Sequence, residues 1–152
     1  MDAIMDLLKE FDPAALLPDI SLVVGIMEVF ARILILAAPL LLLGLGLAYF
    51  FKPIKEANHI FGYRTYFGMG SVDAWKFTQK LAGFLYMCLG GVLTLAMIIV
   101  NLVLIGKDTV TLLTTAAICL FIEVILTGLA VLALNIFLIV RYDRDGYLRG
   151  QR

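Results

Sequence analysis

Residues 33–51 read ILILAAPLLLLGLGLAYFF, and this stretch decides the fold. It carries no charged side chain, and as a helix it can cross the roughly 30 Å hydrocarbon core of a bilayer. The aromatic cluster at residues 49–51 is typical of a membrane–water interface. The apolar character begins near residue 20, so a first span over 20–51 must project from the membrane or bend, and Pro39 is the expected kink.

The composition favours the same environment. Of the 152 residues, 62% are hydrophobic and 16% are charged, and the mean hydropathy is +1.02. A soluble domain is roughly half apolar and about a quarter charged, so a soluble fold of this length would lack the polar surface to cover itself. The net charge is zero, which gives no reason to expect a nucleic-acid partner. Cys88 and Cys119 lie within apolar runs, where small apolar side chains are expected rather than a disulfide.

The chain alternates between apolar spans and polar connections, all expected to belong to a single membrane domain over residues 1–152. In order, these are an N-terminal segment 1–19, a first span 20–51, a polar loop 52–80, a second span 81–105, a third span 110–140 and a tail 141–152. Ser71 can cap a helix, with Asp73 in its first turn, that continues into the second span. We predict an all-α integral membrane bundle of about three transmembrane helices, with an aqueous tail.

The first residues carry an amphipathic pattern. Over residues 2–11, apolar side chains recur at helical spacing opposite charged ones, which predicts a short helix on the membrane surface or on the bundle. Asp12-Pro13 is typical of a helix stop and restart. The acidic start and the long first apolar run argue against a cleavable signal peptide. Whether residues 1–30 form a separate element or extend the first span stays open.

The basic residues are unevenly divided between the two sides of the membrane. Three crossings put the 52–80 loop and the tail on one side, and these two segments hold most of the lysines and arginines. The other side has only Lys9, Arg32 and Lys107. Because basic residues near spans favour the cytoplasm, we expect the N-terminus outside and the C-terminus in the cytoplasm.

The polar loop contains NHIFGYRT at residues 58–65, followed by Asp-Ala-Trp at 73–75. This arrangement resembles the SdpI family of small bacterial membrane proteins, which carries an Asn…Gly-Tyr-Arg-Thr motif and then a Trp about ten residues on, just before a span. The resemblance covers roughly residues 52–92 and implies a multi-pass protein of a bacterial cell membrane. The candidate binding residues are Asn58, Gly62, Tyr63, Arg64, Thr65 and Trp75.

The chain departs from the family pattern in two places. The family often has a Ser-Met-Lys-Asn-like stretch after the motif, where this chain has Gly-Met-Gly-Ser at 68–71. The family often has Ala-Asn after the Trp, where this chain has Thr78-Gln79. These departures weaken the transfer of a specific activity more than the resemblance itself.

The family's best-known member resembles an immunity protein, which protects a bacterium from a secreted toxin peptide and draws a repressor to the membrane. Physically, Gly62 permits backbone conformations closed to other residues, and Arg64 offers donors suited to a phosphate or carboxylate. The loop can therefore recognise a lipid headgroup, a toxin peptide or a cytoplasmic regulator. Alternatively, Arg64 pairs with an acid such as Asp73 or caps a helix, and the aromatic residues only anchor the bundle.

Polar residues also occur within the spans. Glu123 lies in the third span on a stripe of small residues, so we expect it to point inward. Counting about 20 residues from Phe51 and Val140 places Glu123 near the level of Arg32. We therefore hypothesise an outward-facing polar cluster of Glu28, Arg32, Asn101 and Glu123. The alternative is a Glu28–Arg32 pair on one helix with a structural, protonated Glu123.

Catalysis is not expected, because the sequence shows no nucleophile–base pair and no phosphate-binding glycine loop. His59 is the single histidine and has no nearby ligand, so neither a metal site nor a cofactor is expected. The first hypothesis is a membrane-embedded binding protein with a toxin peptide or cytoplasmic regulator as partner. In this hypothesis the outer cluster meets the toxin or peptide, and the Gly-Tyr-Arg-Thr loop presents a surface to the cytoplasm or to lipid headgroups. A small oligomeric transporter or channel lined by Glu123, and a structural subunit of a larger membrane complex, are the alternatives. A homo-oligomer is compatible with all three.

Overall fold

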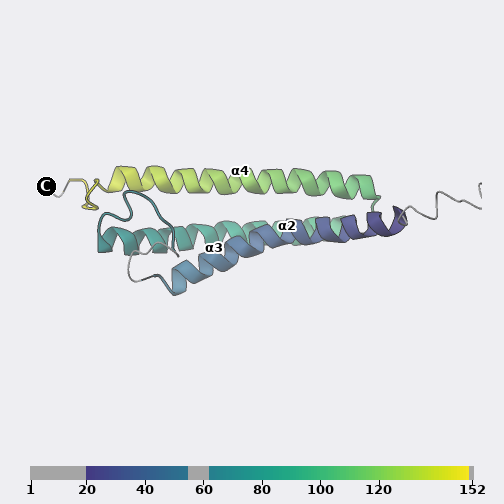
Figure 1. Ribbon diagram of the computed structural model, residues 1–152, viewed down its shortest axis with the longest axis horizontal. Helices are drawn as coiled ribbons and strands as arrows, with labels where there is room; N and C mark the ends of the chain where they lie inside the picture. Colours follow the sequence, from purple (N-terminus) through teal and green to yellow (C-terminus); the bar gives the residue numbers. More distant parts are fainter. Residues whose placement is uncertain (1–19, 55–61, 151–152) are drawn as a thin grey trace, which may run out of the picture.

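The computed structural model describes residues 20–54 and 62–150, and this part of the chain is built from three long helices (Figure 1). They are α2 (Ile20–Phe51), α3 (Val72–Val103) and α4 (Thr109–Arg141). Each is long and apolar enough to cross a membrane, and no strand occurs in the described ranges. The prediction of a three-helix membrane bundle is confirmed to this extent. The amphipathic helix predicted at residues 2–11 lies outside the described residues.

Polar caps set the starts of α3 and α4. The Ser71 hydroxyl accepts a hydrogen bond from the backbone N–H of Ala74 at 3.1 Å, as predicted for a helix that begins well before the second span. The Asp108 carboxylate accepts from the N–H of Thr111 at 2.9 Å. The hydrogen bonds from Thr111 hold the pKa of the Asp108 carboxyl below its usual value, so the cap is charged at neutral pH.

Glycines bring α2 and α3 into backbone contact. A Cβ atom added at Gly46 of α2 would lie 2.2 Å from the backbone nitrogen of Met87, and one at Gly90 of α3 would lie 2.5 Å from that of Leu43. Gly83 approaches the backbone at Phe50 in the same way, at 2.5 Å. Small residues at helix interfaces are typical of membrane bundles, because dispersion contacts and close approach replace the hydrophobic drive of water.

Two clusters of buried side chains join α4 to the other helices, one toward each end of the bundle. The first, near the α3–α4 turn, contains Ala31, Ile35, Met97, Leu112, Ala116 and Cys119. The second, near the loop between α2 and α3, contains Ala74, Ala82, Leu134, Leu138 and Tyr142. The middle of α4 is therefore not covered by either cluster.

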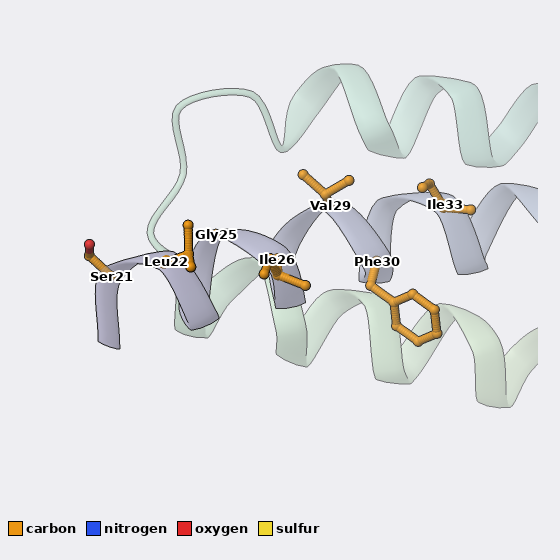
Figure 2. A pocket seen from close by; sticks show the side chains of 7 residues that line it. All are labelled: Ser21, Leu22, Gly25, Ile26, Val29, Phe30 and Ile33. Carbon is orange, nitrogen blue, oxygen red and sulfur yellow. The ribbon is translucent and has the colours of Figure 1, made fainter. Parts of the chain in front are cut away.

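Large apolar side chains cover much of the exterior, as a lipid-facing surface requires. A shallow apolar groove along α2, from Ser21 to Ile33, belongs to this surface (Figure 2). Leu22, Ile26 and Phe30 in this groove are each more than half exposed, at 61 to 62%. This exposed apolar surface of α2 is the kind expected for a helix surrounded by lipid.

The loop and the tail meet at one end of the bundle, opposite the α3–α4 turn (Figure 1). The Ser71 hydroxyl donates to the carbonyl of Gly146 at 2.8 Å, and the backbones of Gly70 and Gly146 approach so closely that neither position has room for a Cβ atom. Tyr142 is 5% exposed and pairs with Leu148 in a single β-bridge. The sequence predicted only an aqueous tail, and it did not show that glycines allow part of the tail to pack on the loop.

Candidate functional site

Gly62, at the start of the motif, packs directly against the ring of Trp75. Gly62 has a φ angle of +106°, a conformation that favours glycine, and a Cβ atom there would lie 2.8 Å from the Trp75 ring. Trp75 is 1% exposed, and its indole N–H donates to the carbonyl of Ile54 at 2.8 Å. The ring is therefore buried, and it ties the segment after α2 to the first turn of α3.

Tyr63 is held through its backbone by Gln79. The N–H of Tyr63 donates to Oε1 of Gln79 at 2.9 Å, and its carbonyl accepts from Nε2 at 2.8 Å. Gln79 itself is completely buried. A single amide side chain therefore satisfies both backbone groups of Tyr63 and fixes the conformation of the loop at this residue.

The Tyr63 side chain reaches α4. Its hydroxyl donates to the carbonyl of Val131 at 3.4 Å and is hydrogen-bonded to the Asn135 side chain. Burial raises the pKa of the Tyr63 phenol, so it stays protonated and able to donate at physiological pH. The motif tyrosine thus connects the loop to the third helix.

Thr65 closes the next turn. Its hydroxyl accepts from the N–H of Gly68 at 3.0 Å, and its carbonyl accepts from the N–H of Met69 at 3.1 Å. Gly68 is buried where a Cβ atom would lie 2.6 Å from the Thr78 hydroxyl. Residues 62–71, together with Trp75 and Gln79, form one packed unit, called the motif platform below.

Arg64 differs from its neighbours in the motif because it is exposed. Tyr66, two residues on, is 71% exposed. The platform therefore buries or half-buries most of the motif and leaves a guanidinium and an aromatic ring at its surface. Asn58, the remaining predicted site residue of the loop, lies outside the described residues.

Three of the four residues predicted to form the outer polar cluster do gather at the α3–α4 turn. Arg32 donates to the carbonyl of Asn101 at 3.2 Å and to that of Leu104 at 2.8 Å. The Glu28 carboxylate accepts a hydrogen bond from the Thr109 hydroxyl. Asn101 contributes its backbone carbonyl, whereas its side chain donates to Met97 of its own helix. Glu28 and Arg32 thereby fasten the start of α2 to the turn.

Glu123 does not belong to this cluster. It is 4% exposed and lines a cavity with Pro39 and Leu42, about two turns along α2 from Arg32 and about four turns along α4 from Thr109. It does point inward, as predicted from its stripe of small neighbours.

The depth prediction failed because the ends of α2 and α4 are not level. Gly83 of α3 packs on the last residues of α2. Phe77, nearly two turns closer to the motif platform on α3, stacks on Phe137 of α4 with ring centroids 6.2 Å apart. Because α4 extends past the end of α2, counting from Phe51 and Val140 as one level placed Glu123 too near the opposite surface.

Comparison with models of known protein families identifies one family that matches more than half of the chain. The model of the SdpI/YfhL protein family matches residues 55–140, which include the motif platform, all of α3 and nearly all of α4. The chain belongs to the SdpI/YfhL family. Searches of curated proteins and of solved structures found no significant match.

The structure of this SdpI/YfhL family member shows three site residues that sequence reasoning missed. Gln79 was noted only as a departure from the family pattern, and Asn135 and Gly146 were not considered. Asn135 is an amide within an apolar run, which is itself a signal for a buried hydrogen bond. No sequence signal marks Gly146 as a packing partner of the loop, because that contact joins residues far apart in the chain.

Replacing Arg32 with alanine is expected to lower the free energy of unfolding by about 1 to 2 kcal/mol, since two carbonyls at the end of α3 lose a charged donor. Arg32→Lys should recover only part of this, because one ammonium group cannot reproduce the fork of the guanidinium. Unfolding of the detergent-solubilised protein by SDS, followed by the fluorescence of the single Trp, measures the difference. Equal stability of Arg32→Ala and wild type would contradict a fastening role.

Proposed function

We propose that the protein is a membrane-embedded binding protein of the immunity and signalling kind, and that the motif platform presents its recognition surface. The observation that carries this proposal is the exposure of Arg64 between two anchored neighbours, Tyr63 and Thr65. A loop that served only to connect two spans would not need a buried tryptophan, a buried glutamine and a docked tail to hold one arginine in place.

The chemistry of Arg64 indicates the kind of group that is bound. A guanidinium presents a planar set of donors that matches a carboxylate or a phosphate. Tyr66, two residues further along the chain, adds an exposed aromatic ring. Such a pair suits the acidic side chains or terminal carboxylate of a toxin peptide or regulator, or a lipid headgroup.

We also propose that the platform faces the cytoplasm of a bacterial cell and that the start of α2 faces outward. The loop and the tail lie at one end of the bundle, and these segments hold most of the basic residues. The excess of positive charge beside the spans supports this orientation. The proposal assigns the protein no catalytic step and no cofactor.

The test is protection of a sensitive bacterium that expresses the chain and is challenged with secreted toxin peptides of related bacteria. Arg64→Ala is expected to lower the tolerated toxin concentration about tenfold, the effect of losing roughly 1.4 kcal/mol of binding. Arg64→Lys should recover part of the protection, because it keeps the charge but not the planar fork.

Arg144→Ala is the matched control, because Arg144 is an exposed arginine in the tail at the same end of the bundle. All variants are compared at equal abundance in the membrane. Protection that is unchanged in Arg64→Ala would contradict the proposed surface. If wild type protects against no peptide, ion or solute flux in liposomes tests the transporter or channel instead.

A further inference from the structure

A cavity of about 370 Å³ lies between the middle parts of α2, α3 and α4. It falls in the gap between the two clusters that join α4 to the bundle. Its lining is almost wholly apolar, with Glu123 as the single ionisable group. The lining residues that matter for the argument are Pro39, Leu42, Leu93, Glu123 and Thr127.

Glu123 is the unusual member of this lining. It is 4% exposed, and within the described residues neither carboxylate oxygen has a hydrogen-bond partner. A buried carboxyl group without partners is costly and marks a functional site by default when it lies within a membrane span. Arg32 does not supply a countercharge to Glu123, because Arg32 and Glu28 make their hydrogen bonds at the α3–α4 turn.

Few polar groups surround Glu123, and the Thr127 hydroxyl is the only other polar side chain of the cavity lining. Pro39 has no N–H, so the carbonyl of Ile35 lacks its ordinary helical donor one turn earlier in α2. The Thr94 hydroxyl, next to Leu93 on α3, is also buried without a partner in the described part of the chain. Because neither carboxylate oxygen of Glu123 accepts a hydrogen bond within the described residues, a ligand that pairs with Glu123 must bring a donor, preferably with positive charge.

The cavity opens at the side of the bundle, between the middle parts of the helices, rather than at either end. Leu41, Leu45 and Val124 belong to its lining and are 69%, 47% and 70% exposed. In a membrane such residues face lipid, so an apolar molecule dissolved in the bilayer can enter the cavity from the side. The oxygens of Glu123 are buried, so its carboxyl group must turn toward such a molecule to pair with it. A cavity of this volume is within the range that small ligands occupy.

We propose that this cavity binds a lipophilic alkylammonium ion, whose ammonium group donates to the Glu123 carboxylate while its alkyl chain lies against the leucine side chains. A hydrated divalent cation fits poorly, because Ca²⁺ and Mg²⁺ require several oxygen ligands and the lining supplies one carboxylate. An anion would be repelled by Glu123 whenever its carboxyl group is ionised. The alkylammonium ion satisfies both requirements, for charge and for apolar contact.

This inference does not rest on the proposed function of the motif platform. Arg64 lies at one end of the bundle, whereas Glu123 lies within the span and in none of the platform contacts. Failure of toxin protection would leave the cavity proposal intact, and failure of amine binding would leave the platform proposal intact.

The test uses radiolabelled decylamine and the full chain in phosphatidylcholine nanodiscs, with empty nanodiscs measuring partition into lipid. Wild type is expected to bind decylamine saturably above that background. Glu123→Gln should weaken the binding about tenfold, because an amide keeps the shape but loses the charge. Thr127→Phe should abolish it by filling the cavity while Glu123 is retained. Decanol, which has the same chain and no charge, should bind wild type and Glu123→Gln equally.

Glu28→Gln is the matched control and should bind decylamine as wild type does, because Glu28 lies at the α3–α4 turn, outside the cavity. Melting temperatures confirm that each variant is folded, and if Thr127→Phe is unstable, the pair Glu123→Gln and Glu28→Gln decides alone. Wild-type retention no greater than in empty nanodiscs, or equal binding by wild type and Glu123→Gln, overturns the proposal.

Discussion

Replacing Gly46 with alanine is expected to lower the free energy of unfolding by about 3 kcal/mol. The added Cβ atom would lie 2.2 Å from the backbone nitrogen of Met87 and 2.7 Å from its Cα. Backbone atoms cannot turn aside as the end of a side chain can, so α2 and α3 must separate. The separation weakens contacts along both helices, including those at Gly83 and Gly90.

Gly44→Ala is the control for this prediction, because it makes the same chemical change two residues away on the same helix. A Cβ atom at Gly44 meets nothing within 4 Å, and alanine is the better helix former by about 1 kcal/mol. SDS-induced unfolding, followed by the fluorescence of Trp75, should therefore show Gly44→Ala at least as stable as wild type. Similar losses in the two variants would contradict backbone-to-backbone packing at Gly46.

The spans could be predicted from the sequence, but their packing could not. The first span was predicted over 20–51 and is observed as α2, Ile20–Phe51, because length and apolar character are what a bilayer selects. The sequence alone does not show which way Gly83, Gly90 and Gly91 point, since helices that are apolar on all sides have little amphipathic pattern. The structure turns Gly83 and Gly90 toward the α2 backbone, whereas Gly91 has only a side-chain neighbour, at 4.0 Å.

The sequence predicted which residues belong to the candidate site better than it predicted what each of them does. The Gly-Tyr-Arg-Thr motif and the following Trp were found through their resemblance, in residues and in spacing, to the SdpI family pattern. The spacing could not show that Trp75 is buried or that Tyr63 reaches α4, because both facts depend on how the loop folds back over α3. Glu123 was correctly predicted to point inward, but it was predicted at the wrong depth in the bundle. The sequence does not reveal how far one helix extends past another.

Replacing Gln79 is expected to cause the second large loss of stability. The sequence marked this residue only as a departure from the family pattern. Gln79→Met keeps the length of the side chain and removes both hydrogen bonds to Tyr63. Leaving a buried donor or acceptor unsatisfied costs about 1 to 3 kcal/mol each, so the variant should lose about 2 to 3 kcal/mol of stability. Exchange of the Tyr63 amide hydrogen, followed by mass spectrometry, should accelerate at least about tenfold.

Lys80→Met introduces the same side chain at the next position, which is exposed, and should leave the exchange of the Tyr63 amide unchanged. The comparison with Arg64→Ala then separates scaffold from surface. If Gln79 holds the platform, Gln79→Met should lose toxin protection together with amide protection, whereas Arg64→Ala should lose the first and keep the second. Persistent protection of the Tyr63 amide in Gln79→Met would instead mean that the Trp75–Ile54 and Ser71–Gly146 hydrogen bonds suffice to hold the loop.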